Sequence, residues 1–123
     1  MKFMISFTHT NGEMADRVPR WNELTDDEKR SLGDHLKELA DKLQNEQNTN
    51  MIFFGNPDNA QTVHLDRDGN LEVGEGTLLE GDEFVGGYYI INVDSKEEAL
   101  DWAKQTRWLV GTNEVRQIVT PEA

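Results

Sequence analysis

The chain has 123 residues, 36% of them hydrophobic, which is enough to bury a single core, so we expect one domain over residues 1–123. Its 24 acidic and 12 basic residues give a formal net charge of −12, which disfavours nucleic acid and anionic membranes as partners. The absence of cysteine excludes disulfide bonds and thiolate nucleophiles, and no apolar run approaches the roughly 18 residues of a membrane span. We therefore expect a soluble, cytoplasmic protein.

The first residues alternate between apolar and polar side chains, which is typical of a strand with one buried face. Phe3, Ile5 and Phe7 form the buried face, and His9 stands at its polar end. His9 is a candidate substrate contact, with an ordinary boundary histidine as the alternative. Residues 10–23 have no clean period and are expected to form a loop.

A helix is predicted to begin after Thr25, whose side chain can cap the first turn while Glu28 reaches back to the cap. It should run to about residue 43 with one apolar stripe made of leucines, namely Leu32, Leu36, Leu39 and Leu43. The stripe predicts packing on a sheet. Residues 44–50, rich in Asn and Gln, should end the helix, with an asparagine in the left-handed conformation.

His35 is the leading candidate for a catalytic residue. It stands at the edge of the leucine stripe, between Leu32 and Leu39. A histidine there could act as a general acid or base, because the unperturbed pKa of histidine, near ~6.5, needs little tuning. The alternative is a boundary histidine that is hydrogen-bonded to a carbonyl group or to water.

Three short strands are expected next. Residues 51–54 predict a buried strand, and residues 61–66 and 70–73 predict a hairpin joined through Asp68-Gly69. His64 should face solvent on the polar side of the hairpin. The acidic residues around the turn superficially resemble a calcium loop, but their glycine stands at the fourth rather than the sixth position and no glutamate follows at the twelfth. A hairpin turn is therefore the prediction.

Residues 74–83 form an acidic segment with several glycines. Its carboxylates could hold a hard cation or serve a histidine as a partner, with a solvated loop as the alternative, and they are Glu75, Glu80, Asp82 and Glu83. Glu75 is also a candidate substrate contact. No histidine pair has metal-ligand spacing and no glycine-rich phosphate loop opens a helix, so we predict neither a metal site nor a cofactor.

The longest apolar strand is predicted over residues 85–93, with apolar side chains on both faces. A helix capped by Ser95 follows it, and a last strand is predicted over residues 114–119. Tyr88 and Arg116 are candidates for positioning a substrate, Arg116 through an anionic group. A surface or capping role for Arg116 is the alternative.

The order of the predicted elements is strand, helix, two or three short strands, strand, helix, strand. This order fits a ferredoxin-like α+β sandwich, in which an antiparallel sheet carries both helices on one face. The other face would stay uncovered, although the strand over residues 85–93 has apolar side chains on both faces. A second copy of the chain is the simplest cover, which predicts a homodimer whose two sheets enclose a partly apolar cavity.

Four phrases of the chain resemble YCII-related proteins of the DGPF-domain type. They are Met1-Lys2-Phe3-Met4-Ile5, Leu24-Thr25-Asp26-Asp27-Glu28, the run from Gly86-Gly87-Tyr88-Tyr89-Ile90-Ile91 to Glu98-Ala99-Leu100-Asp101-Trp102-Ala103, and Val115-Arg116-Gln117-Ile118. The resemblance covers nearly the whole chain. It implies a dimeric α+β barrel with a pocket between the sheet and the helices.

The same resemblance implies a suspected enzyme activity that uses a histidine with an aspartate. The histidine of the family is similar in position to His35, whereas the aspartate has no convincing counterpart near residues 105–107. The motif that names the DGPF type corresponds to Glu75-Gly76-Thr77-Leu78, which keeps the acid and the glycine but lacks the proline and the aromatic residue.

We therefore expect a protein that binds a small organic molecule over its sheet. In the catalytic hypothesis, His35 is the base in an isomerisation or elimination of a small acid or lactone, a nearby carboxylate orients it, and Arg116 or Tyr88 places the substrate. The alternatives are a non-catalytic ligand-binding or regulatory module and a protein-interaction module with a filled cavity.

Overall fold

The computed structural model describes residues 1–10, 24–54, 59–76, 83–106 and 112–121. In this part of the chain the elements are, in order, β1 Lys2–Thr10, α1 Asp26–Gln47, β2 Ile52–Phe53, β3 Gln61–Leu65, β4 Leu71–Glu75, β5 Glu83–Asn92, α2 Lys96–Gln105 and β6 Asn113–Ile118. The predicted order of strands and helices is confirmed. Most of the loop expected over residues 10–23 lies outside the described residues.

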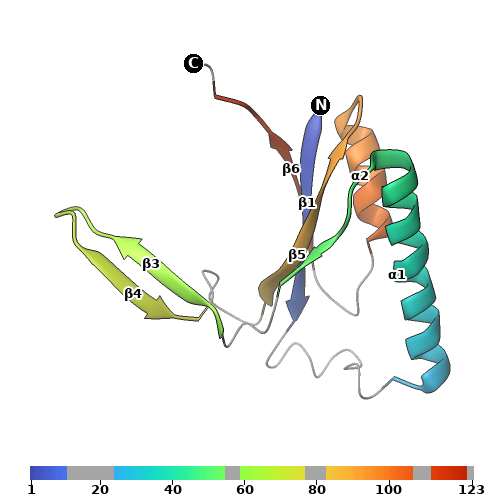
Figure 1. Ribbon diagram of the computed structural model, residues 1–123, viewed down its shortest axis with the longest axis horizontal. Helices are drawn as coiled ribbons and strands as arrows, with labels where there is room; N and C mark the ends of the chain where they lie inside the picture. Colours follow the sequence, from blue (N-terminus) through green and yellow to red (C-terminus); the bar gives the residue numbers. More distant parts are fainter. Residues whose placement is uncertain (11–23, 55–58, 77–82, 107–111, 122–123) are drawn as a thin grey trace.

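Four of the strands form one antiparallel sheet in the order β2-β5-β1-β6. Both helices lie on the same side of it (Figure 1). This order, with a central first strand and the helices on one face, is compatible with the ferredoxin-like α+β fold that the sequence predicts. In the register of this sheet, Ile5 of β1 lies opposite Tyr89 of β5 on one side and opposite Val115 of β6 on the other.

The core lies between this sheet and the helices. The sheet contributes alternate residues of β1 and β5, among them Ile5 and Tyr89, which are fully buried. The helices contribute Leu43 of α1 and Trp102 of α2. Each large apolar side chain buried in this way contributes roughly 1.5–3 kcal/mol to folding. The leucine stripe is confirmed in its second half, since its first two members are only half-buried.

The ends of α1 follow the predicted capping chemistry. Thr25 accepts a hydrogen bond from the Glu28 backbone, and the Glu28 carboxylate accepts one from the Thr25 backbone. Asn48 ends the helix in the left-handed conformation, with φ of 50° and ψ of 44°. The helix extends to Gln47, about one turn beyond the predicted end, because the glutamine- and glutamate-containing segment continues the helix as far as this cap.

The prediction of a buried strand at residues 51–54 is wrong in one respect. Pairing with β5 forms β2 as expected, but Ile52, Phe53 and Phe54 are about half exposed. The reason is the position of β2 in the sheet, because among the described strands it is an outer one and pairs only with β5. Ile52 and Phe54 also point to the face of the sheet that neither α1 nor α2 covers, as their contacts with Tyr88 show.

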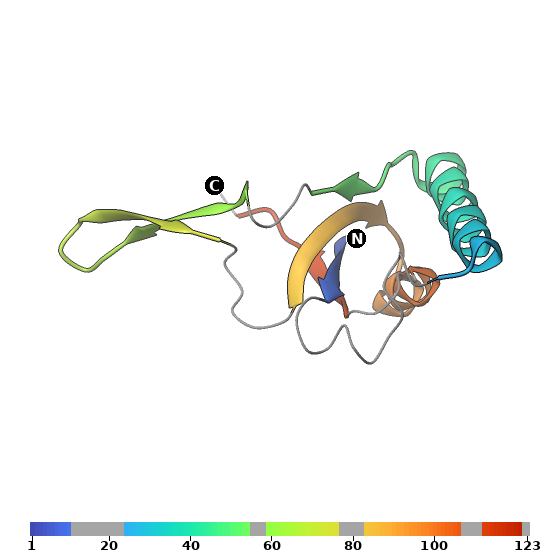
Figure 2. The same ribbon diagram turned by 90° about the horizontal axis from the view of Figure 1, so that it is seen from below.

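β3 and β4 form a separate two-stranded hairpin, which projects from the sheet on the side away from the helices (Figures 1 and 2). The predicted turn is confirmed. Gly69 has a φ of 85°, and the Asp66 carboxylate accepts hydrogen bonds from the backbone N–H groups of Asp68 at 2.9 Å and Asn70 at 2.8 Å. The bond from Asn70 is the main cause that holds the pKa of Asp66 below its usual value. His64 is exposed, as expected.

Candidate functional site

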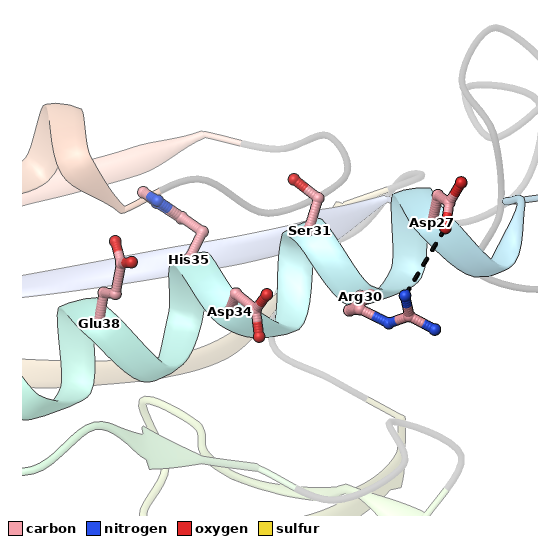
Figure 3. Close-up of a pocket in the computed structure, with 6 residues that line it drawn as sticks. All are labelled: Asp27, Arg30, Ser31, Asp34, His35 and Glu38. Atoms are coloured by element: carbon pink, nitrogen blue, oxygen red, sulfur yellow. Dashed lines mark ion pairs between the residues drawn. The ribbon is translucent and has the colours of Figure 1, made fainter.

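A shallow pocket of about 400 Å³ lies along the exposed side of α1 and includes His35. The described residues that line it all belong to this helix, and they are Asp27, Arg30, Ser31, Asp34, His35 and Glu38 (Figure 3). Ser31 and Glu38 stand four residues before and three residues after His35. Their side chains therefore project to the same side of the helix as the imidazole ring, as Figure 3 shows.

The imidazole of His35 joins the two helices. Its Nε2 lies 2.8 Å from the carbonyl oxygen of Gln105, the last residue of α2. Since a carbonyl oxygen can only accept, Nε2 carries the hydrogen and donates it. In the neutral ring, Nδ1 then keeps its lone pair. The bond also satisfies one of the carbonyl groups that the end of a helix leaves without a partner.

Carboxylates dominate the electrostatics of this pocket. Among the described residues that line it, three are carboxylates, Asp27, Asp34 and Glu38, and one is a cation, Arg30. Arg30 lies 3.8 Å from Asp27, but both side chains are strongly exposed, so this ion pair contributes little to stability. This excess of carboxylates favours a cationic group of a ligand over an anion.

Tyr88 and Arg116 lie on the other side of the sheet. Tyr88 is opposite Ser6, and Arg116 is opposite Met4, so both side chains belong to the face that neither α1 nor α2 covers, here called the helix-free face. They stand on strands that flank β1, about 10 Å apart from strand to strand. Arg116 forms an ion pair with Glu114 at 2.8 Å. The ring of Phe54 lies 5.9 Å from that of Tyr88.

The other candidates are dispersed. Glu75 ends β4 on the hairpin and accepts a hydrogen bond from the Gln61 side chain at 3.1 Å. His9 pairs with Phe84 through the backbone of β1, while its side chain lies outside what the structure describes. Glu80, Asp82 and the Glu83 side chain lie outside it as well. A single chain therefore brings Tyr88 and Arg116 to one face and leaves His35 on the other side of the sheet.

Sequence reasoning did not single out Ser31 or Gln105. The four-residue spacing from Ser31 to His35 was visible in the sequence and would have identified the serine as a neighbour on the helix. The carbonyl of Gln105 carries no such signal, because it meets His35 only through the packing of α2 against α1. Backbone acceptors of this kind cannot be found from residue types.

Nearly the whole chain matches one protein family. A family model for the YCII-related domain matches residues 1–120. The chain belongs to the YCII-related family. No curated protein matches it. Among the described residues of this YCII-related chain, no group of three or more His, Cys, Asp or Glu could hold a metal ion, and neither α1 nor α2 is long and apolar enough to cross a membrane.

Proposed function

We propose that this YCII-related protein binds a small organic acid or lactone over the helix-free face, and that a second copy of the chain closes the space as a dimeric α+β barrel. The supporting observation is the composition of that face. Ile90 and Ile118 are each 38% exposed there, on the same face as Tyr88 and Arg116. Apolar surface with a few polar groups is typical of a small-molecule site.

Arg116 is the group we assign to the ligand's carboxylate or carbonyl oxygen. Its guanidinium has five N–H donors, and the ion pair with Glu114 leaves donors for a second oxygen group. Since the Arg116 side chain is mainly exposed in the single chain, closure by a second copy would strengthen this contact by excluding water.

A thermal-shift titration with small carboxylic acids and lactones tests this proposal. We expect a ligand at about 100 times its Kd to stabilise the protein by roughly 2.7 kcal/mol, which raises Tm by several degrees. The shift should be lost in Arg116→Ala and kept in Arg30→Ala, an exposed arginine on α1 that serves as the matched control. An equal shift in both variants would contradict the proposed role of Arg116.

Proton transfer at His35 is a second candidate function. It is favoured by the hydrogen bond to Gln105, which fixes the tautomer and leaves Nδ1 as the base, and by the carboxylate of Glu38, which projects to the same side of the helix. The base would remove a proton next to the carbonyl group of an acid or lactone bound in the pocket along α1, on the other side of the sheet from Arg116, as in an isomerisation or elimination. A non-catalytic ligand-binding or regulatory role remains the competing proposal.

Exchange of the ligand's acidic C–H protons in D₂O, followed by NMR, distinguishes these roles. His35→Gln removes the base but keeps an amide that can donate to the Gln105 carbonyl, so we expect exchange to stop while the fold persists. His64→Ala, at an exposed histidine of β3, is the matched control and should exchange like the wild type. Exchange that continues in His35→Gln would exclude His35 as the base.

The subgroup and the cellular compartment are also proposals. We infer the DGPF-domain type from the phrase that begins at Gly86-Gly87 and from the acid and glycine at Glu75-Gly76. A cytoplasmic location is consistent with the absence of cysteine and the net charge of −12.

A further inference from the structure

One face of the β3–β4 hairpin is apolar and open to solvent. In the antiparallel register Val63 pairs with Val73, and Leu65 pairs with Leu71, so these four side chains share one face. They are between 63% and 69% exposed, and we call them the apolar row. The opposite face carries polar residues, including His64 paired with Glu72. This alternation is typical of a strand pair that buries one face.

A hairpin of this kind needs a partner. Two isolated strands are at best marginally stable in water, because too little apolar surface is buried. The apolar row is not covered by the rest of the described chain. We propose that the hairpin is a dimerisation arm, whose apolar row packs on a second copy of this chain.

The geometry favours a second copy as the occupant. The hairpin projects on the side of the sheet away from the helices, which is also the side of the helix-free face (Figures 1 and 2). One chain therefore presents two uncovered apolar surfaces on the same side. A two-fold symmetric dimer can cover both surfaces of both chains at once, because in such an interface each chain contributes the same surfaces to the contact.

The arm has the reach that this pairing requires. Its strands have five residues each, so they extend about 17 Å. The outer strands of a four-stranded sheet are separated by about 14 Å. An arm anchored on one chain can thus extend across the width of the partner's sheet.

The exposed area also matches a dimer. The helix-free face exposes Ile52, Phe54, Ile90 and Ile118 in addition to the apolar row. From the relation between transfer free energy and area, these eight side chains expose roughly 250–500 Å² of apolar surface. Because about 60% of an interface is apolar, this apolar surface corresponds to a total interface of roughly 400–900 Å² per partner. Stable interfaces bury about 800 Å² per partner. An anionic membrane is disfavoured as the occupant, because the chain carries a net charge of −12.

This inference rests on the homodimer of the proposed function and adds the element that holds it together. The test is the solution mass, measured by light scattering over a range of concentrations. The double variant Val63→Lys with Val73→Lys places two charges in the apolar row. The matched control, His64→Lys with Glu72→Lys, places them in the neighbouring pair on the polar face. We expect the first to weaken the dimer by at least about tenfold and the second to leave it unchanged.

A third variant keeps the test valid if charged residues disturb the hairpin itself. Gly76 donates a backbone hydrogen bond to Ala60 at 2.8 Å, so the two ends of the arm are adjacent. Joining Ala60 directly to Gly76 removes the arm, and none of the buried core residues lies in the removed segment. We expect this variant to fold, as judged by circular dichroism, and to be monomeric at concentrations where the wild type is a dimer.

The outcomes separate the two proposals. A wild-type dimer that persists without the arm overturns the arm and leaves the sheet-to-sheet dimer of the proposed function intact. A wild type that is monomeric at all concentrations overturns both, and would indicate that the apolar row meets a different protein. A wild-type dimer that dissociates in the row variant and in the excision variant, but not in the control, supports the arm.

Discussion

Tyr89 combines a buried ring with a polar hydroxyl group. Its side chain is fully buried, yet its hydroxyl lies 2.6 Å from Oγ1 of Thr106 and 3.2 Å from the Trp102 carbonyl, to which it donates. Loss of hydration raises the pKa of Tyr89 to about 12, although the hydrogen bond with Thr106 acts in the opposite direction. The tyrosine thus joins β5 to the end of α2 as a neutral group.

This shift predicts how stability depends on alkaline pH. Because the pKa of Tyr89 is raised in the folded protein, the tyrosine of the unfolded chain ionises first, near pH 10. The contribution of Tyr89 to the free energy of unfolding is therefore fully present below pH 10 and is lost as the pH rises toward 12. For this tyrosine the loss amounts to roughly 2–3 kcal/mol. In urea unfolding at several pH values, Tyr89→Phe should lack this contribution and be about 1 kcal/mol less stable at pH 7. Tyr88→Phe should behave like the wild type in both respects.

At the scale of elements, the attachment of β2 depends on a glycine in its neighbour. Gly87 of β5 lies opposite Phe53, and a Cβ atom at this position would overlap the carbonyl oxygen of Ile52 and stand 2.6 Å from Cζ of Phe7. The rings of Phe7 and Phe53 meet edge to face across this position, with centroids 5.7 Å apart. The missing side chain of Gly87 is therefore what allows β2 to approach.

We expect Gly87→Ala to destabilise the protein by roughly 1–3 kcal/mol, because either β2 or the Phe7 ring must move. Gly33→Ala is the opposite case. No atom lies within 4 Å of a Cβ placed on Gly33 in the exposed part of α1, so this change should stabilise the helix by about 0.5–1 kcal/mol. Chemical unfolding of both variants, with amide exchange of β2, checks the pair. Similar destabilisation by both would contradict this account.

At the scale of the whole molecule, the sequence predicts what local chemistry determines. The capping residues of α1, an asparagine exit within residues 44–50 and the turn at Gly69 were predicted because each depends on residues close in the chain. The exposure of β2 was not, because apolar character alone does not tell an outer strand from a central one. The contact between His35 and Gln105 joins residues 70 positions apart, which no periodicity encodes.

The position of β1 has a consequence for how the chain reaches this fold. β1 is a central strand, yet its partners come late in the sequence, since Lys2 pairs with Asn92 on one side and with Ile118 on the other. During synthesis this apolar strand has neither neighbour until most of the chain has been made. Closing such long loops is slow compared with forming α1, so folding should be late and rate-limited by sheet closure. Until then β1 is an unpaired strand, and molecular chaperones would be most useful in that interval.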